Sequence, residues 1–132
     1  MKSLAAVLVC VALCWEGLNA ECPEPTALKD ANGGKLCARL FTDSHYVFAQ
    51  SCGGASLDVF PGDDVPTIDR KWNNRVSSLV VARSCSLTVW DYAKKGGTKR
   101  KFSTGIQYQL KDVPKGLFGN WNDDISAYYC TC

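Results

Sequence analysis

Histidine and long apolar runs are scarce in this 132-residue chain, and each scarcity excludes a class of function. His45 is the only histidine, so a two-histidine nuclease site is excluded. The one close cysteine pair is the CTC string at 130–132, whereas structural zinc prefers two tight Cys/His pairs. No later run approaches the about 20 apolar residues that span a bilayer, and no N-x-[ST] string predicts N-glycosylation.

The N-terminus has the pattern of a secretory signal peptide. Lys2 precedes an apolar run over residues 4–15, and Ala20 supplies a small residue before ECPEP. We therefore expect cleavage after Ala20, which leaves one soluble domain of residues 21–132 in the secretory pathway. The net charge of the whole chain is only +2, so nucleic acid is not an expected partner.

Cleavage would leave an even number of cysteines in an oxidising compartment. This predicts three disulfides, each contributing about 2–4 kcal/mol by restricting the unfolded chain. Six cysteines allow 15 connectivities, among which the sequence does not choose. The cysteines are Cys22, Cys37, Cys52, Cys85, Cys130 and Cys132.

Short segments rich in β-branched and aromatic residues alternate with Gly, Pro, Asn and Asp clusters. This spacing is typical of an all-β sandwich. The expected strands are 35–41, 55–60, 77–82, 85–90, 99–103, 106–110 and 126–130. We expect three tryptophans, Trp72, Trp90 and Trp121, to fill its core.

The chain also repeats itself. CARLFTD at 37–43 is similar to CSLTVWD at 85–91, an offset of 48, and WNNRVSS at 72–78 is similar to WNDDISA at 121–127, an offset of 49. Because both pairs of strings recur at nearly the same offset, the sequence predicts two Greek keys, about 36–83 and 84–132. Each key alone would expose an apolar face, so we expect the two to pack together.

The repeated string carries a family resemblance. NNRVSS at 73–78 fits [N/D]-[N/D]-x-x-[S/T]-S at every position, and NDDISA at 122–127 fits at five of six. A Greek-key repeat with this string resembles a βγ-crystallin domain, a sandwich of two keys with paired calcium sites. Keys of that family open with an aromatic residue, a second aromatic five residues on, and a glycine two further.

That opening is incomplete in both repeats. The first repeat has Phe41 and Tyr46 but carries Phe48 where the glycine is expected. The second has Trp90 and Gly97 but carries Lys95 where the second aromatic is expected. We therefore expect altered local hairpins within an unchanged overall fold.

The resemblance implies weak calcium sites of oxygen ligands, with dissociation constants on the order of 10⁻⁵ to 10⁻³ M. In each string the spacer residue would give a main-chain carbonyl and the next serine a hydroxyl, while an oxygen of the other repeat completes the shell. The carboxylates of the second string predict that its site is the tighter one. Alternatively, the strings only cap turns. The candidate ligands are Asn74, Arg75, Ser77, Asp123, Asp124 and Ser126.

A second resemblance covers the whole of residues 21–132. The ordered strings CP, CARLF, GGASL, SSLVVARSCSLTVW, KFSTG, NWNDDISAYYC and TC are similar to those of the syncollin family. That resemblance implies a zymogen-granule protein of the lumen that associates with the granule membrane, forms homo-oligomers and supports regulated exocytosis. It also implies calcium-sensitive syntaxin binding, which conflicts with a luminal chain because syntaxin lies mostly in the cytosol.

A basic stretch, KKGGTKRK at 94–101, supplies a candidate binding surface. Its two glycines predict a hairpin tip that presents the cations together. Such a tip could meet anionic phospholipid, at about 1 kcal/mol per basic residue, or sulfated glycans. The alternative is a solvated loop. The cations are Lys94, Lys95, Lys99, Arg100 and Lys101.

Three functional hypotheses follow. The favoured one is a non-enzymatic luminal granule protein, peripheral on the membrane and oligomeric, that supports packaging and regulated exocytosis of secretory cargo. The second is a secreted cationic defence protein that binds or permeabilises microbial membranes or surface glycans. The third is a hydrolase that uses His45 with Asp43, which ranks last because no nucleophile elbow or second base accompanies them.

Overall fold

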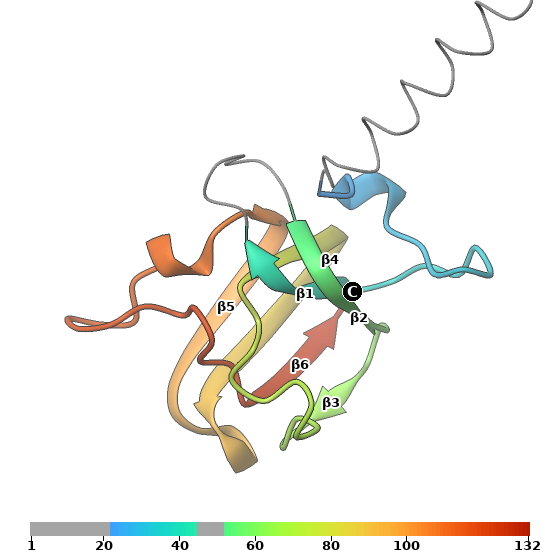
Figure 1. The fold of residues 1–132 in the computed structure, drawn as a ribbon. Helices are drawn as coiled ribbons and strands as arrows, with labels where there is room; N and C mark the ends of the chain where they lie inside the picture. Colours follow the sequence, from blue (N-terminus) through green and yellow to red (C-terminus); the bar gives the residue numbers. More distant parts are fainter. Residues whose placement is uncertain (1–21, 45–51) are drawn as a thin grey trace, which may run out of the picture.

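The computed structural model describes residues 22–44 and 52–132, and their strands form one curled, antiparallel sheet (Figure 1). No helix within these two ranges is both long and apolar enough to cross a membrane. The elements are η1 Pro25–Ala27, β1 Ala38–Ser44, β2 Cys52–Val59, β3 Asp64–Val65, β4 Ser78–Tyr92, η2 Ala93–Lys95, β5 Gly96–Gln107, η3 Leu110–Asp112 and β6 Ala127–Thr131. The predicted all-β class is confirmed.

Strand β4 is shared by two halves of the sheet. Its first part pairs with β1, as in Leu40↔Leu79, and its second part pairs with β6, as in Val89↔Tyr128. Strand β5 follows the other edge of β4 through both parts. The register shifts between Val81 and Ser86, where Ser84 has a left-handed φ of 63°. The sheet therefore divides into β2-β1-β4-β5 and β3-β6-β4-β5.

Each repeat completes the half-sheet of the other. Strand β3 of the first repeat pairs with β6 of the second, while the end of β5, from the second repeat, pairs with the start of β4. This exchange is why one repeat could not bury its apolar face alone. It confirms the expected βγ-crystallin-like sandwich of two Greek keys. The expected boundary between residues 83 and 84 falls inside β4.

The expected strands were mostly found, but their limits moved. The segments 77–82 and 85–90 belong to the single strand β4, and β5 takes in 99–103 together with the start of 106–110. Strand β3 was missed because it has two residues within an acidic, proline-flanked stretch. It exists because the backbone of β6 offers it a partner, in the pairs Asp64↔Tyr129 and Val65↔Tyr128.

The core lies between the two halves of the curled sheet. Alternate residues of β4, such as Leu87 and Val89, are wholly buried, as the period of two of a strand requires. Trp121 is 1% exposed and is among the largest buried side chains. Trp72 is half-buried and packs against the core, whereas Trp90 is half-buried at the sheet end. The expectation of a tryptophan-filled core is therefore met most fully by Trp121.

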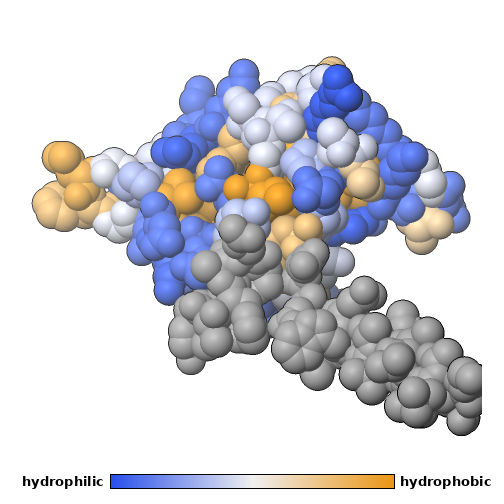
Figure 2. Space-filling model, turned by 90° about the horizontal axis from the view of Figure 1, so that it is seen from above, coloured by the Kyte–Doolittle hydropathy of each residue, from blue (hydrophilic) through white to orange (hydrophobic). Residues whose placement is uncertain are grey.

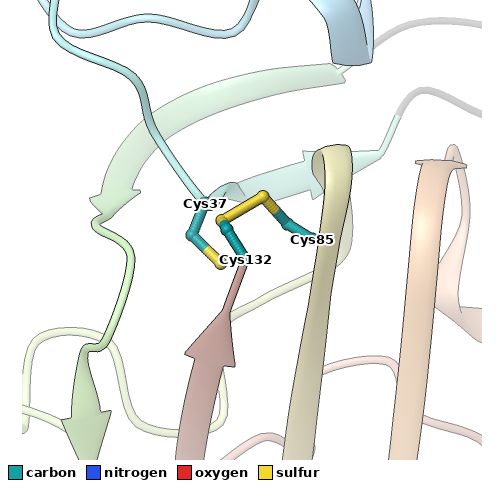
Figure 3. A group of neighbouring side chains, drawn as sticks. All are labelled: Cys37, Cys85 and Cys132. Carbon is teal, nitrogen blue, oxygen red and sulfur yellow. A yellow bond between two sulfur atoms is a disulfide. The ribbon is translucent and has the colours of Figure 1, made fainter.

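The six expected cysteines form three disulfides, Cys22–Cys52, Cys37–Cys130 and Cys85–Cys132. The sulfur atoms of Cys37, Cys85 and Cys132 lie within 4.8 Å of one another (Figure 3). Because each is bonded in a disulfide, none is the thiolate that a metal requires. The group is thus two adjoining bridges that tie the C-terminal strand to both halves of the sheet.

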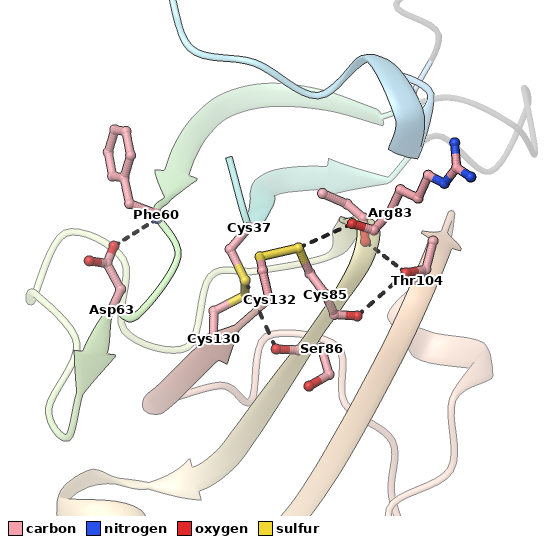
Figure 4. The surroundings of a disulfide bond; sticks show 10 residues. Cys37, Phe60, Asp63, Arg83, Cys85, Ser86, Thr104, Cys130 and Cys132 are labelled. Atoms are coloured by element: carbon pink, nitrogen blue, oxygen red, sulfur yellow. Dashed lines mark hydrogen bonds between the residues drawn. A yellow bond between two sulfur atoms is a disulfide. The ribbon is translucent and has the colours of Figure 1, made fainter. Parts of the chain in front are cut away.

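Strand β5 is also bound to the bend of β4 beside these bridges. The Thr104 hydroxyl donates to the carbonyl oxygen of Ala82 at 2.7 Å and to that of Cys85 at 3.4 Å (Figure 4). These bonds replace ladder hydrogen bonds that the register shift removes. The bend is therefore held by side-chain bonding as well as by disulfides.

Candidate functional site

The two repeated strings meet across the molecule through reciprocal side-chain pairs. The Ser77 hydroxyl donates to Asp123 Oδ1 at 3.1 Å, and the Ser126 hydroxyl donates to Asn74 Oδ1 at 3.1 Å. Both serines are buried. Each pair takes its serine from one repeat and its acceptor from the other, so we call them the Ser77–Asp123 pair and the Ser126–Asn74 pair.

The backbone repeats this crossed arrangement. The Asn74 amide donates to the Ile125 carbonyl at 3.2 Å, and the Asp123 amide donates to the Val76 carbonyl at 2.9 Å. Asn74 and Asp123 have left-handed φ angles of 58° and 56°. Asn and Asp tolerate this conformation better than most residues. The second position of the string thus serves both the turn and the oxygen it presents.

The two strings differ at their last position. The Ser78 hydroxyl donates to the Asp43 carbonyl at 2.7 Å and ties β4 to the end of β1. Ala127 stands at the equivalent position and has no hydroxyl to make such a bond. The one position at which the second string departs from the pattern therefore costs a hydrogen bond within the sheet and leaves the crossed pairs intact.

Charge is divided between the pairs in a way that the sequence did not indicate. We expected Asp123 and Asp124 to favour the second site. The structure instead places the Asp123 carboxylate beside Ser77, while the Asp124 carboxylate is hydrogen-bonded to Lys115. The Ser77–Asp123 pair is therefore the charged one, and the Ser126–Asn74 pair is formally neutral.

Lys115 joins the second string to the end of β4. Its Nζ atom lies 3.1 Å from Asp91 Oδ2 and is hydrogen-bonded to Asp124 Oδ2. The bond to Asp124 raises the pKa of Lys115 against the opposing effect of burial, and Asp91 adds to the rise. Sequence reasoning missed Lys115 because nothing in the loop string PKGLFGN relates it to a carboxylate.

The spacing of the paired oxygens suits a calcium ion. Two oxygens bound to one Ca²⁺ at about 2.4 Å lie about 3 Å apart, and both pairs show 3.1 Å. The carbonyls of Arg75 and Asp124 precede the serines by two positions and would add main-chain oxygens. The same oxygens also satisfy each other as turn caps, so the geometry serves either role.

The cationic hairpin is the β4–β5 connection, at the bottom of Figure 1. Its turn is η2, where Lys94 and Lys95 have left-handed φ angles, and the two glycines begin β5. Lys95 is held against the sheet, 2.6 Å from Asp64 and with its Nζ 5.4 Å from the Trp90 ring centre. All five basic residues of the stretch are nevertheless exposed.

A glycine with a left-handed φ closes the equivalent hairpin in each repeat. Gly97 has a φ of 74°, and an added Cβ would collide with Asp91 Oδ1, which accepts the Thr98 amide at 2.7 Å. Gly54 has a φ of 76°, and its added Cβ would collide with the Thr42 hydroxyl oxygen.

This corrects the expected glycine position in the first repeat. The Thr42 hydroxyl oxygen accepts the Ala55 amide at 3.1 Å, as Asp91 accepts the Thr98 amide. The glycine equivalent to Gly97 is therefore Gly54, and the prediction based on position 48 was wrong because the first connection is longer. Tyr46 and Phe48 themselves lie outside the described residues.

The structure also corrects the alignment of the first strands. The Ser77 amide donates to the Phe41 carbonyl and the Ser126 amide to the Trp90 carbonyl, both at 2.9 Å. Phe41 is thus equivalent to Trp90, as the aromatic openings of the two repeats already indicated, at an offset of 49 that matches the tryptophan strings. The cysteine-based offset of 48 was wrong by one residue. His45, the residue of the hydrolase hypothesis, lies outside the described residues.

Comparison with known proteins agrees with this geometry. Solved structures with this fold include a βγ-crystallin domain of Abundant Perithecial Protein from Neurospora crassa in its Ca²⁺-bound form. It has a TM-score of 0.54 and 17% identity, over 85% of this chain and 94% of that one. That likeness shows the fold.

Sequence comparison reaches further. The chain is 43% identical to syncollin of Rattus norvegicus over 133 residues and 39% identical to syncollin of Homo sapiens over 136 residues. Both alignments cover 100% of this chain and 99% of the relative. The family model described as syncollin matches residues 21–132. The chain belongs to the syncollin family.

Proposed function

We propose that this protein is a non-enzymatic component of secretory granules. After loss of a signal peptide at residues 1–20 it resides in the granule lumen, attaches peripherally to the membrane and self-associates. There it supports packaging and regulated exocytosis of secretory cargo. Membership of the syncollin family supports the granule assignment, and three disulfides suit an oxidising lumen.

The observation that carries the membrane attachment is the cationic hairpin. Lys94, Lys99, Arg100 and Lys101 are exposed on the hairpin and on β5, while Lys95 is paired with Asp64. Cations near an anionic bilayer contribute about 1 kcal/mol each, so these four would hold the protein reversibly and in a salt-dependent manner. Sulfated glycans of a granule matrix would meet the same cations.

Vesicle binding tests this attachment. The test variant carries glutamine in place of Lys94, Lys95, Lys99, Arg100 and Lys101. We expect it to co-sediment more weakly with vesicles that contain phosphatidylserine, and as strongly as the parent with neutral vesicles. A matched control carries the same number of Lys or Arg to Gln changes at exposed positions elsewhere. These control positions are Lys29, Lys35, Arg70, Lys71 and Arg83.

The control equalises net charge, so a specific hairpin predicts a loss in the first variant only. An equal loss of binding in the two variants would mean that net charge alone attracts the protein to the vesicles. Undiminished binding of the hairpin variant would make the stretch a solvated loop.

We further propose that calcium binds weakly at the crossed pairs. The first site would use the Arg75 carbonyl, the Ser77 hydroxyl and the Asp123 carboxylate. The second would use the Asp124 carbonyl, the Ser126 hydroxyl and the Asn74 carboxamide. The crossed oxygens at 3.1 Å support this proposal, as does a calcium-bound protein with the same fold.

A secreted defence protein is the second candidate, because exposed cations could equally meet microbial membranes or surface glycans. Two measurements separate the candidates. Killing of bacteria at physiological salt would favour defence. Recovery in purified granules, with release from their membranes by alkaline carbonate, would favour the peripheral granule protein.

A further inference from the structure

Two adjacent apolar side chains stand at the tip of the loop that precedes β6. Leu117 is 94% exposed and Phe118 is 87% exposed, against 66% for Tyr92 and 43% for Phe60. A folded protein does not gain stability from apolar side chains left in water. Their exposure as a neighbouring pair therefore indicates an interaction surface rather than scattered surface residues.

The loop is constructed to project this pair. Pro114 and Asn120 form a bridge, and the Lys115 amide donates to the Gly119 carbonyl at 3.1 Å. Gly116 and Gly119 flank the tip with left-handed φ angles of 71° and 81°. The loop leaves the fold as a narrow projection in Figure 1, and an apolar projection lies at the same edge in Figure 2.

The base of the projection is fixed beside the cationic hairpin. Lys115 is bonded to Asp91 and Asp124, and its Nζ lies 5.9 Å from the centre of the Trp121 ring. Asp91 accepts the Thr98 amide of the hairpin through its other oxygen. One buried carboxylate thus joins the bases of both projections, and Figure 1 shows the loop and the hairpin on neighbouring sides of the molecule.

The composition of the loop removes an obstacle to insertion. Residues 113–120 read VPKGLFGN and contain no carboxylate, so no negative charge would have to leave water as the tip enters an apolar layer. The only charged side chain, Lys115, is turned back to its carboxylates. The tip itself carries leucine and phenylalanine, the side chains by which interfacial segments enter lipid.

We propose that Leu117 and Phe118 enter the interfacial layer of a phospholipid membrane while the adjacent hairpin contacts the headgroups. This rests on the proposed function, because it takes the edge between the hairpin and the loop as the part of the protein that faces the membrane. A lipid fits better than a protein partner. A stable protein interface takes about 800 Å² per partner, whereas two side chains on a convex tip offer a small contact that a fluid layer can surround.

Vesicle binding of a double variant, Leu117→Ser with Phe118→Ser, tests the proposal. We expect its affinity to fall about tenfold or more on neutral and on phosphatidylserine vesicles alike, because the lost contact is apolar. Phe60→Ser, which removes an exposed phenylalanine between β2 and β3, should bind as the parent does. A thermal melt of each variant checks that the fold is retained.

A probe at the tip supplies an independent readout. In Phe118→Trp, phospholipids brominated in the acyl chains should quench more tryptophan fluorescence than in the parent, since Trp121 is buried and Trp72 and Trp90 are half-buried in the fold. Unchanged quenching, together with parental binding of the double serine variant, would overturn the insertion. Loss of self-association by the double serine variant with vesicle binding retained would also overturn it, because the tip would then contact a second copy of the chain.

The two proposals fail separately. If only the hairpin glutamine variant loses binding, attachment through the hairpin is supported and insertion of the tip is overturned. If only the tip variant loses binding, insertion of the tip is supported and attachment through the hairpin is overturned. If the parent binds neither kind of vesicle, and granule fractionation finds no membrane-bound protein, both are overturned.

Discussion

The two repeats differ most in the hairpin that follows their first strand. In the second repeat the chain passes from Trp90 to Gly97 in a short hairpin, while in the first it runs from Phe41 to Gly54. Both hairpins nevertheless end on a glycine with a left-handed φ. In each, the residue after the glycine donates its amide to the side chain that directly follows the aromatic residue. The conformation of the closing glycine is kept in both, although the spacing that leads to it is not.

The repeats also differ in the charge that they contribute to the crossed pairs. The first repeat supplies the carboxamide of Asn74 and the second supplies the carboxylate of Asp123, at equal distances from their serines. Geometry is therefore shared while electrostatics is not. Since each oxygen faces the other repeat, the charged residue of the second string serves the serine of the first.

The disulfides offer the comparison with the largest expected effect. Replacing Cys37 and Cys130 by alanine should reduce the free energy of unfolding by more than replacing Cys85 and Cys132. Their sequence separations are 93 and 47. While the other bridge stays intact, however, each closes a loop of about 50 residues, so chain entropy alone predicts about 4.1 kcal/mol for either. Burial of Cys37 and Cys130 makes their loss the larger one, because alanine leaves a cavity there.

Urea denaturation of the two double variants measures this difference. Each should be compared with the parent under conditions that keep the remaining bridges intact. A larger loss on removal of Cys85–Cys132 would show that burial does not rank the two adjoining disulfides.

The closing glycines give the next largest effect. We expect Gly97→Ala to cost about 3 kcal/mol, because a left-handed alanine is strained by about 1–2 kcal/mol and its Cβ would displace the buried Asp91 carboxylate. Gly54→Ala should cost less, since Thr42 is only half-buried and can rotate away. Gly33→Ala is the control, because its φ is 82° and nothing lies within 4 Å of an added Cβ.

Denaturation curves for the three alanine variants supply the ranking. If all three variants lose the same free energy of unfolding, the loss comes from backbone strain alone, and collisions with Asp91 and Thr42 play no part.

Exchange of charge between the crossed pairs tests whether their electrostatic difference affects calcium binding. Asp123→Asn should weaken calcium binding at the first site about tenfold, and Asn74→Asp should strengthen the second by a similar factor, because carboxylates bind Ca²⁺ more strongly than carboxamides. Titration calorimetry measures both. In the parent, millimolar calcium should raise the melting temperature through linkage.

Ser77→Ala with Ser126→Ala provides the matched control, because it removes both hydroxyls and leaves the charges unchanged. The calcium-dependent rise in melting temperature should disappear in this variant. A parent melting temperature that calcium does not move would make the crossed pairs turn caps.

Alkaline pH gives the smallest effect. Asp124 raises the pKa of Lys115, and burial together with Asp63 raises that of Tyr128. A raised folded-state pKa contributes stability below the ordinary value, about 10 for both groups, and that contribution is lost as pH rises through the folded value. The melting temperature should therefore fall above about pH 10.

Lys115→Gln should remove part of this alkaline dependence. The part is below about 1 kcal/mol because solvent screens a partly exposed pair. Lys29→Gln, at an exposed position, should leave the profile unchanged. Thermal melts across the alkaline range make the comparison, and identical profiles for the two variants would count against the Lys115 link.

The sequence predicted much of the fold because its signals are local. Strand segments appear as β-branched and aromatic runs, and the tryptophan strings mark the period of 49 directly. The misses have local causes too. Strand β3 has no pattern of its own and depends on β6, and Gly54 was overlooked because a longer connection displaces it from the family spacing.

Composition and spacing along the chain are enough to establish the all-β class, the two-fold repeat and the six cysteines of residues 21–132. Which residues meet depends instead on the tertiary structure. Ser77 and Asp123 are 46 positions apart, and Ser126 and Asn74 are 52 apart. Such contacts depend on how two half-sheets exchange strands and pack, and packing depends on the whole core rather than on any local pattern.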